Sequence, residues 1–216
     1  MLKNSFVKVR ELFINKYCHI KNNKVFVDGR MVFDNGEAEN LKMFAKSLYR
    51  HLKPSYNKFF KMDEISKLGF LAAEVLLKDI NLSAYAEEEV SIVLSNSHST
   101  LITDQKHQKT IEDNNNFFPS PSVFVYTLPN IMIGEISIRH KLRGENTFFV
   151  VENFNPNLLS NHINNLFLTR KSKAFVGGWV NQSENDFEAF LYFSSEKGNI
   201  LHNAFEINRL HNLILE

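Results

Sequence analysis

The run EVSIVLSNS, residues 89–97, restricts the possible folds more than any other part of this sequence. It is short and mainly apolar, and a run of this kind is typical of a strand buried on both faces in a parallel sheet. Parallel neighbours are joined by crossover connections, which are usually helices packed against the sheet. The run therefore predicts an α/β fold.

Apolar side chains at helical spacing predict helices on both sides of this strand. The predicted helices are Glu37–His51, Met62–Asp79, Asn130–Gly144 and a fourth that begins at Pro156. The third is expected to stop at Gly144. In the fourth, Asn155 is expected to cap the helix ahead of Pro156. Its apolar stripe consists of Leu159, Ile163, Leu166 and Phe167.

Several β-rich runs complete the pattern. They are Glu11–Ile20, Lys24–Gly29, Asn146–Glu152, Lys173–Val180 and Phe187–Ser195. The first two suggest a hairpin, the third a buried strand, and the last two antiparallel neighbours joined by a turn. Residues 95–122 are expected to form a long polar loop with a short helix inside it. These elements predict one domain, 1–216, with a mixed five-stranded sheet and helices on both faces.

Composition limits the classes of function. The net charge of +1 gives no overall field for a nucleic-acid backbone, so no nucleic-acid partner is expected. The Lys-rich stretch Lys53–Lys67 is interpreted as a solvated face, with a docking patch as the alternative. Charges interrupt the N-terminal apolar runs, so no signal peptide or membrane span is expected and the protein is assigned to the cytoplasm.

Reactive groups are sparse in the sequence. The single cysteine, Cys18, lies in a strand-like context and is interpreted as a small buried apolar residue. The eight histidines show no metal-ligand spacing, so neither a metal nor another cofactor is expected. His98 lies among serines 95–99, but the segment has no elbow or oxyanion-hole signature, which favours a polar loop.

Several segments together resemble the N-terminal half of a β-ketoacyl synthase of the thiolase-like superfamily. They are KMDEISKLGFLAAEVLL, SNSHSTLITDQKH, PSPSVFVYTLPNIMIGEISIRHKLRG and the strand-turn-helix that begins at Thr147. The likeness covers about residues 59–194, and Pro119–Gly144 is its most specific part. It implies half of a thiolase-like fold, with the second half missing.

The resemblance also implies that the catalytic residues are lost. Aligning Gly144 with the glycine of the family's Arg-Gly pair places Asn153 at the position of the family's nucleophilic cysteine. A carboxamide cannot ionise or attack a thioester. The family's two catalytic histidines belong to the second half. No catalytic residue is therefore assigned.

The resemblance implies a non-catalytic partner of an active, Cys-containing ketosynthase. The sequence is similar to chain-length factors, which shape the acyl tunnel, and most similar to those of aryl polyene and flexirubin-type pigment pathways, in polyketide or fatty acid biosynthesis. In the family, the strand before the nucleophile pairs with its counterpart across the dimer, and the resemblance places this strand at Thr147–Glu152. An apolar edge of this kind needs a partner, so a heterodimer is expected. An acyl carrier protein is a further candidate partner. The candidate interface and tunnel residues are Pro129, Asn130, Thr147, Phe148, Phe149, Val150, Val151, Glu152, Asn153 and Phe154.

A physical argument also points to a partner. Without a second half, the stripe on the helix after Asn153 would be uncovered unless another chain or the C-terminal tail covers it. The tail is expected to form a capping helix through Phe205, Leu210, Leu213 and Ile214. Two alternatives stay open: a stand-alone acyltransferase or thioesterase-like enzyme with a relocated nucleophile, and a homodimeric acyl-binding protein.

Overall fold

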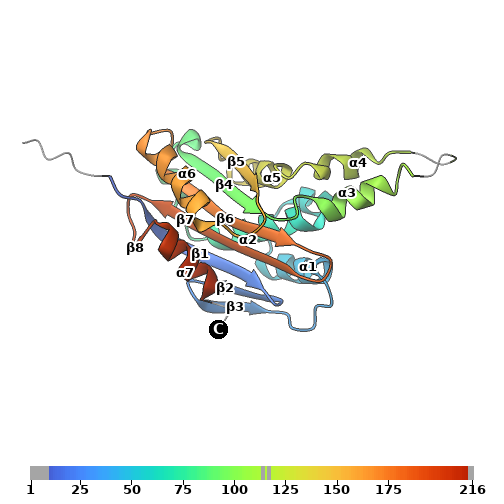
Figure 1. The fold of residues 1–216 in the computed structure, drawn as a ribbon. Helices are drawn as coiled ribbons and strands as arrows, with labels where there is room; N and C mark the ends of the chain where they lie inside the picture. The colour runs from blue at the N-terminus through green and yellow to red at the C-terminus, as the bar shows by residue number, and fades with distance from the viewer. Residues whose placement is uncertain (1–9, 113–114, 116–117, 214–216) are drawn as a thin grey trace, which may run out of the picture.

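The chain folds into three layers, with a central sheet between two sets of helices (Figure 1). The computed structural model describes residues 10–112, 115 and 118–213. The α-helices are α1 (Leu41–Leu52), α2 (Glu64–Leu77), α3 (Leu101–Gln108), α4 (Pro121–Phe124), α5 (Ile131–His140), α6 (Pro156–Leu168) and α7 (Ala204–Asn212). The 3-10 turns are η1 (Asn57–Lys61), η2 (Leu82–Ala84), η3 (Glu87–Glu89) and η4 (Val125–Thr127). Helices α1, α2 and α5 cover one face of the sheet, and α6 and α7 cover the other.

The sheet is mixed and has eight strands, three more than the five expected from the sequence. The strands are β1 (Phe13–Lys21), β2 (Lys24–Val27), β3 (Arg30–Asp34), β4 (Val90–Asn96), β5 (Asn146–Val150), β6 (Ala174–Gln182), β7 (Phe187–Ser195) and β8 (Ile200–Leu201). Their order is β3-β2-β1-β7-β6-β4-β5, with β8 paired to β1. Strand β4 runs parallel to β5 and β6, as expected, and the other pairs are antiparallel.

The extra strands come mainly from two successive hairpins. Asn22 and Asn23 both have positive φ in the turn between β1 and β2, which suits a tight hairpin. The Asp28-Gly29 pair, also at positive φ, then turns the chain from β2 into β3. Strand β8 is a two-residue addition near the start of β1. The mixed sheet with helices on both faces is confirmed, and the strand number is corrected.

The centre of the fold agrees with the sequence pattern. Every residue of β4 is buried. Helix α2 begins after Asp63, whose side chain accepts the Ser66 N–H at 3.0 Å. Apolar side chains cover most of its circumference because it lies between the sheet and two other helices, α1 and α5. This layer holds the larger of two apolar cores.

Helix α5 ends earlier than predicted, and Gly144 does not stop it. The helix ends at His140, and Lys141 adopts the left-handed conformation at its C-cap, with φ of 56°. Gly144 instead lies where the chain passes closely by β4, since a Cβ at this position would clash with the Val90 carbonyl oxygen. The glycine is required by close approach between segments and not by the helix end.

The stripe on α6 is covered within the chain itself. Leu159 and Ile163 are fully buried in the second core, which lies between the sheet, α6 and α7. Helix α7 contributes Ile207 and Leu210 to this core. The predicted capping helix is therefore confirmed, although Phe205 points outward at 74% exposure. Leu213 is also exposed, and Ile214 lies outside the described residues.

Covering the stripe in this way removes the physical argument for a partner over α6. The outward face of α6 carries the exposed residues Asn157, Asn161 and Asn165, which are suited to solvent. The apolar flank of this helix thus needs no second chain. Any case for a partner has to rest on another part of the molecule.

Residues 101–127 contain two helices where one was expected. Helices α3 and α4 lie side by side and extend away from the sheet (Figure 1). A hydrogen bond joins the start of α3 to the end of η4, since Thr100 Oγ1 donates to the Thr127 carbonyl at 2.7 Å. We call α3, α4, η4 and the flanking residues Phe118 and Leu128 the helical arm.

Candidate functional site

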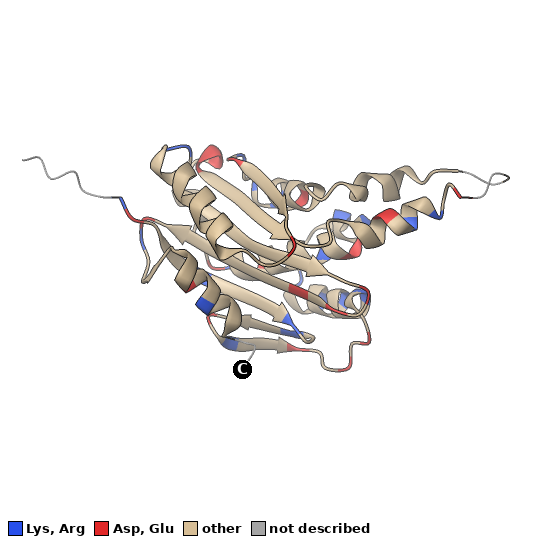
Figure 2. Ribbon diagram, viewed as in Figure 1, with Lys and Arg blue, Asp and Glu red and all other residues tan. Residues whose placement is uncertain are grey.

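Strand β5 forms an open edge of the sheet. It pairs with β4 alone within the described residues, and its positions are partly or fully exposed. The expectation of a buried strand is therefore wrong for the single chain. None of its five residues is charged, so the edge has no charge to discourage pairing (Figure 2).

The hydrogen-bond pattern defines which backbone groups of β5 face outward. Ile92 N–H donates to Glu145 O and Val151 N–H donates to Asn96 O, both at 2.9 Å. Alternate residues of a strand direct their backbone groups to the same side. The N–H and C=O groups of Phe148 and Val150 consequently face away from β4.

The side chains of β5 divide between the two faces of the sheet. Thr147 Oγ1 lies 3.2 Å from His162 Nε2 on α6, and the Phe149 ring meets the same histidine edge to face at 5.2 Å. Phe148 packs against the core on the opposite face. Val150 follows it on that face and is 52% exposed.

Asn153 lies in an exposed loop and not in the first turn of α6. Glu152 and Asn153 are both exposed, and the helix begins only at Pro156. Asn155 is the cap, as predicted, because its Oδ1 accepts the Leu158 N–H at 2.9 Å. That bond uses an amide at the helix N-terminus that could otherwise stabilise an anion. The position is therefore not arranged to activate a nucleophile.

Phe154 belongs to an aromatic cluster beneath the C-terminal end of α7. Its ring stacks on His211 with centroids 4.1 Å apart and meets Trp179 and Phe190 edge to face, both at 5.9 Å. Strands β6 and β7 provide Trp179 and Phe190. These contacts give Phe154 a packing role.

A small polar cluster lies at the carboxyl ends of β4 and β6. Ser97 Oγ is 2.7 Å from His98 Nδ1 and 3.0 Å from Asn181 Oδ1, which also accepts the Ser97 N–H at 3.2 Å. One hydroxyl proton cannot serve both acceptors at once. No carboxylate within the described chain orients His98. The cluster therefore provides hydrogen-bond partners for polar groups at the ends of the two strands, and it does not activate Ser97 as a nucleophile.

Cys18 cannot supply the missing nucleophile. It is fully buried on β1, and its thiol donates to the Ala72 carbonyl at 3.4 Å. Burial raises the pKa of this thiol to about 12. The interpretation of Cys18 as a buried apolar residue is confirmed.

The two remaining candidates lie where the helical arm meets α5. Pro129 and Asn130 form the turn before this helix, and Asn130 occupies the cap position without a capping hydrogen bond from its side chain. Beside them the arm exposes large apolar side chains that the sequence analysis did not single out. These are Phe118 at 82%, Phe124 at 55%, Val125 at 45% and Leu128 at 50%.

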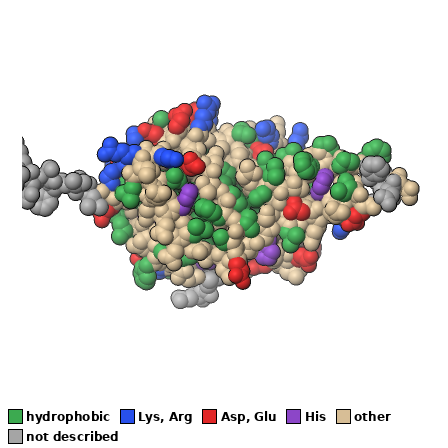
Figure 3. Space-filling model, turned by 45° about the horizontal axis from the view of Figure 1, so that its top comes forward, with side chains coloured by type: hydrophobic (Ala, Val, Ile, Leu, Met, Phe, Trp, Pro, Cys, Tyr) green, Lys and Arg blue, Asp and Glu red, His purple; other side chains and the backbone are tan. Residues whose placement is uncertain are grey.

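An apolar surface therefore extends over this side of the molecule. Figure 3 shows hydrophobic side chains gathered over the arm and toward the sheet. The run PSVFVYTLP, which contains no charge, is the sequence signal that could have indicated an exposed surface. We call the β5 edge and the exposed side chains of the arm the apolar edge surface.

Sequence comparison finds no matching family model and no significant match among curated proteins. Comparison with solved structures finds many similar folds. The ishigamide ketosynthase/chain length factor is 14% identical with a TM-score of 0.63, over 86% of this chain and 62% of that one. A complex of the ketosynthase ApeO with its chain length factor ApeC from Xenorhabdus doucetiae is 11% identical with a TM-score of 0.55, over 88% and 80%.

A third neighbour is a type II polyketide ketosynthase, AntDE, in complex with the acyl-carrier protein AntF. It is 12% identical with a TM-score of 0.56, and the match covers 96% of this chain and 65% of that one. At these identities the likeness shows the fold alone, which is the ketosynthase-type, thiolase-like fold expected from the sequence. The match spans 62% of the ishigamide chain and 80% of the chain from the ApeO complex, so this chain corresponds to part of each of these proteins. Among the described residues, no helix is both long and apolar enough to cross a membrane.

Proposed function

We propose that this chain is a non-catalytic, ketosynthase-like subunit that pairs with an active, Cys-containing ketosynthase and shapes its acyl tunnel. The observation that carries the proposal is the uncharged open edge of β5 beside the exposed apolar arm. An edge strand of this kind is a ready template for pairing with another chain. The exposed Asn153 at the family's cysteine position supports the non-catalytic part.

The structural neighbours support the choice of partner. Two of them are described as ketosynthases with chain length factors, and one as a ketosynthase with its acyl-carrier protein. We extend the proposal to aryl polyene or flexirubin-type biosynthesis in the cytoplasm, with a carrier protein as the second partner to test. The finer assignment rests on the sequence resemblance.

Co-expression with a Cys-containing ketosynthase encoded nearby tests the pairing. We expect Val150→Lys to prevent co-purification, because it places a charge in the proposed interface. Val32→Lys is the matched control, since Val32 is 49% exposed on β3 at the opposite edge of the sheet. Equal co-purification of both variants would overturn the role of the β5 edge.

Activity assays separate this proposal from an enzyme with a relocated nucleophile. We expect the purified chain alone to neither hydrolyse nor condense acyl-carrier thioesters. Hydrolysis that disappears in Ser97→Ala would instead support the enzyme, since Ser97 Oγ lies 2.7 Å from His98 Nδ1. Light scattering of the chain alone tests the homodimeric alternative, which requires twice the 25.1 kDa of one chain.

A further inference from the structure

A small apolar pocket lies between the β2–β3 hairpin and the C-terminal ends of α1 and α2. It holds about 160 Å³, and its walls are mainly valine and leucine side chains together with Phe33. Val25, Leu48 and Val75 are buried, so they form the inner wall of this pocket. We call it the hairpin pocket.

A β-bulge turns two consecutive side chains toward the hairpin pocket. Val25 on β2 pairs with Phe33 on β3. The next pair is Phe26 with Met31, so Val32 has no partner on β2. In a regular strand consecutive side chains point to opposite faces of the sheet, but Val32 and Phe33 both line the pocket. Val32 is 49% exposed and therefore lies at the mouth.

The volume of the pocket limits what can enter it. A cavity of about 150 Å³ accommodates one benzene ring. The hairpin pocket, at about 160 Å³, therefore has room for one six-membered ring or a short branched chain. Apolar space that is left unfilled lacks the dispersion contacts that its lining atoms would make with a ligand. An apolar group of the right size would thus stabilise the chain by filling it.

Two lysines and a histidine line the pocket beside a single acidic residue. Lys16 Nζ lies 3.1 Å from Asp79 Oδ2, and the Lys16 side chain is 11% exposed, whereas that of Asp79 is 76% exposed. Lys78 and His51 are exposed, and neither forms an ion pair within the described residues. Water screens an ion pair with so exposed an acid, so Lys16 has little to lose by exchanging Asp79 for the anionic group of a ligand.

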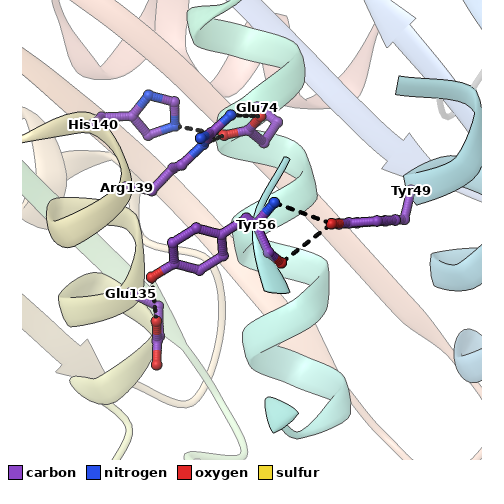
Figure 4. A network of polar contacts seen from close by, with 6 residues as sticks. All are labelled: Tyr49, Tyr56, Glu74, Glu135, Arg139 and His140. Carbon is purple, nitrogen blue, oxygen red and sulfur yellow. Dashed lines mark hydrogen bonds and ion pairs between the residues drawn. The ribbon is translucent and has the colours of Figure 1, made fainter. Parts of the chain in front are cut away.

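The two helices that wall the pocket are fixed before any ligand binds. On α1, the Tyr49 hydroxyl donates to the Tyr56 carbonyl at 3.1 Å and accepts the Tyr56 N–H at 3.3 Å (Figure 4). On α2, Glu74 accepts two hydrogen bonds from Arg139 of α5, at 2.8 and 3.2 Å (Figure 4). A preformed site of this kind loses little conformational entropy on binding.

We propose that the hairpin pocket binds a small monocarboxylate whose body is a single ring or a short branched chain. The body would fill the space beside Val25, Leu48 and Val75, and the carboxylate would meet Lys16 and Lys78. The lysines would repel an ammonium group, and a neutral head would gain no charge-assisted hydrogen bond. The charge at the pocket therefore selects an anion, and the apolar walls select its body.

The proposal is independent of ketosynthase pairing through β5. The hairpin pocket is built on β2 and β3, and β3 is at the opposite edge of the sheet from β5. Substitutions in the pocket therefore leave the β5 edge intact. Failure to bind a carboxylate would leave co-purification with a ketosynthase unchanged, and the reverse also holds.

The test uses the full chain and four small probes. The first is cyclohexanecarboxylate, which combines one ring with one negative charge. Cyclohexanecarboxamide keeps the ring but has a neutral head, and cyclohexylmethylamine has a positive one. Acetate has the charged head without the ring. Backbone amide chemical shifts, followed by nuclear magnetic resonance, measure the affinity of each probe and the place where it binds.

Two variants remove the two parts of the proposed site separately. Lys16→Met/Lys78→Met removes the charges, and Val27→Phe places a larger side chain in the pocket, since Val27 lines it. The control is Lys24→Met/Lys171→Met, which removes the same charge outside the pocket. Lys24 is matched to Lys16 because it also forms an ion pair with an aspartate, at 3.7 Å.

We expect cyclohexanecarboxylate to bind the wild type and the control alike, and to bind each pocket variant at least about tenfold more weakly. The carboxamide, the amine and acetate should each bind the wild type at least about tenfold more weakly than cyclohexanecarboxylate does. The amides that shift should lie in β2, β3 and the last turns of α1 and α2.

Several results would overturn the proposal. They are the absence of saturable binding, equal binding of any other probe, equal binding by either pocket variant, and shifts confined to another part of the chain. A pocket that instead receives an apolar side chain of a protein partner would bind the carboxamide as well as the carboxylate. Unchanged circular dichroism confirms that each variant is folded.

Discussion

Asn155 Oδ1 accepts the Leu158 N–H at 2.9 Å and caps α6, two residues after the position that aligns with the family's cysteine. The helix therefore starts beyond Asn153 and leaves that residue in an exposed loop. A cysteine nucleophile gains its reactivity from a helix N-terminus and from partial burial, and Asn153 has neither. In the proposed non-catalytic subunit, the departure from the family's cysteine site thus involves the local backbone as well as one side chain.

The capping bond predicts a clear difference between the two asparagines. Asn155→Ala should lower the free energy of unfolding by about 1 kcal/mol, because it leaves an amide at the helix N-terminus unsatisfied. Asn153→Ala should change it by less than about 0.5 kcal/mol, as an exposed loop substitution. Urea unfolding followed by circular dichroism measures both. A larger loss for Asn153→Ala would show that this residue has a structural role.

Restoring a cysteine should not restore condensation. We expect Asn153→Cys to be acylated by acyl thioesters no faster than Asn185→Cys, an exposed cysteine in the turn between β6 and β7. Both thiols lack the environment that stabilises a thiolate. Mass spectrometry of the intact chains follows the acylation. Rapid, selective acylation at position 153 would contradict the non-catalytic assignment.

His19 predicts an acid-sensitive stability. Burial, followed by the neighbouring His211 and Lys21, lowers the pKa of His19 from 6.5 to about 3. The unfolded chain therefore binds a proton that the folded chain does not, and stability falls as the pH drops from 6.5 toward about 3. The contribution of this residue has a slope of up to about 1.4 kcal/mol per pH unit.

His19→Phe should remove this part of the pH dependence. The ring stacks on Phe190 at 4.6 Å, and neither of its nitrogens has a hydrogen-bond partner in the described chain, so phenylalanine keeps an aromatic ring at the site without breaking a hydrogen bond. At neutral pH we expect equal or greater stability, and at pH below 6.5 a smaller loss than in the wild type. Urea unfolding across this range measures the difference. Parallel pH profiles would contradict the assignment.

Two glycines near α5 should respond in opposite directions to alanine. Gly144→Ala places a methyl group against the Val90 carbonyl, so we expect a loss of about 1–3 kcal/mol. Gly134→Ala meets no atom within 4 Å in the middle of α5 and should gain about 0.5–1 kcal/mol. Thermal unfolding distinguishes them. Equal effects would contradict the close approach at Gly144.

The sequence predicts the elements whose burial pattern is local. Local sequence patterns predict three of these features correctly: the burial of β4, the apolar helix α2 and the cap at Asn155. Helix α5 ends before the predicted residue because Lys141 adopts the left-handed backbone that ends it. Gly144 is required by its close approach to Val90, at the start of β4. Such a contact has no local signature.

The candidate surfaces were harder to predict for a related reason. The run NTFFV has the same composition whether a neighbouring strand covers it or not, so the local pattern predicts a buried strand, and only the family resemblance indicates an edge. The apolar side of α6 is buried by Ile207 and Leu210, which lie on α7, and this contact between distant parts of the chain leaves no mark in the local sequence of α6.

Hydrogen exchange at two amides of β5 tests the central proposal most directly. The N–H groups of Phe148 and Val150 face outward from the sheet, so both should exchange rapidly in the free chain. If a ketosynthase strand pairs with this edge, exchange at both amides should slow at least about tenfold in the complex. A stable complex in which both amides exchange as fast as in the free chain would contradict the account.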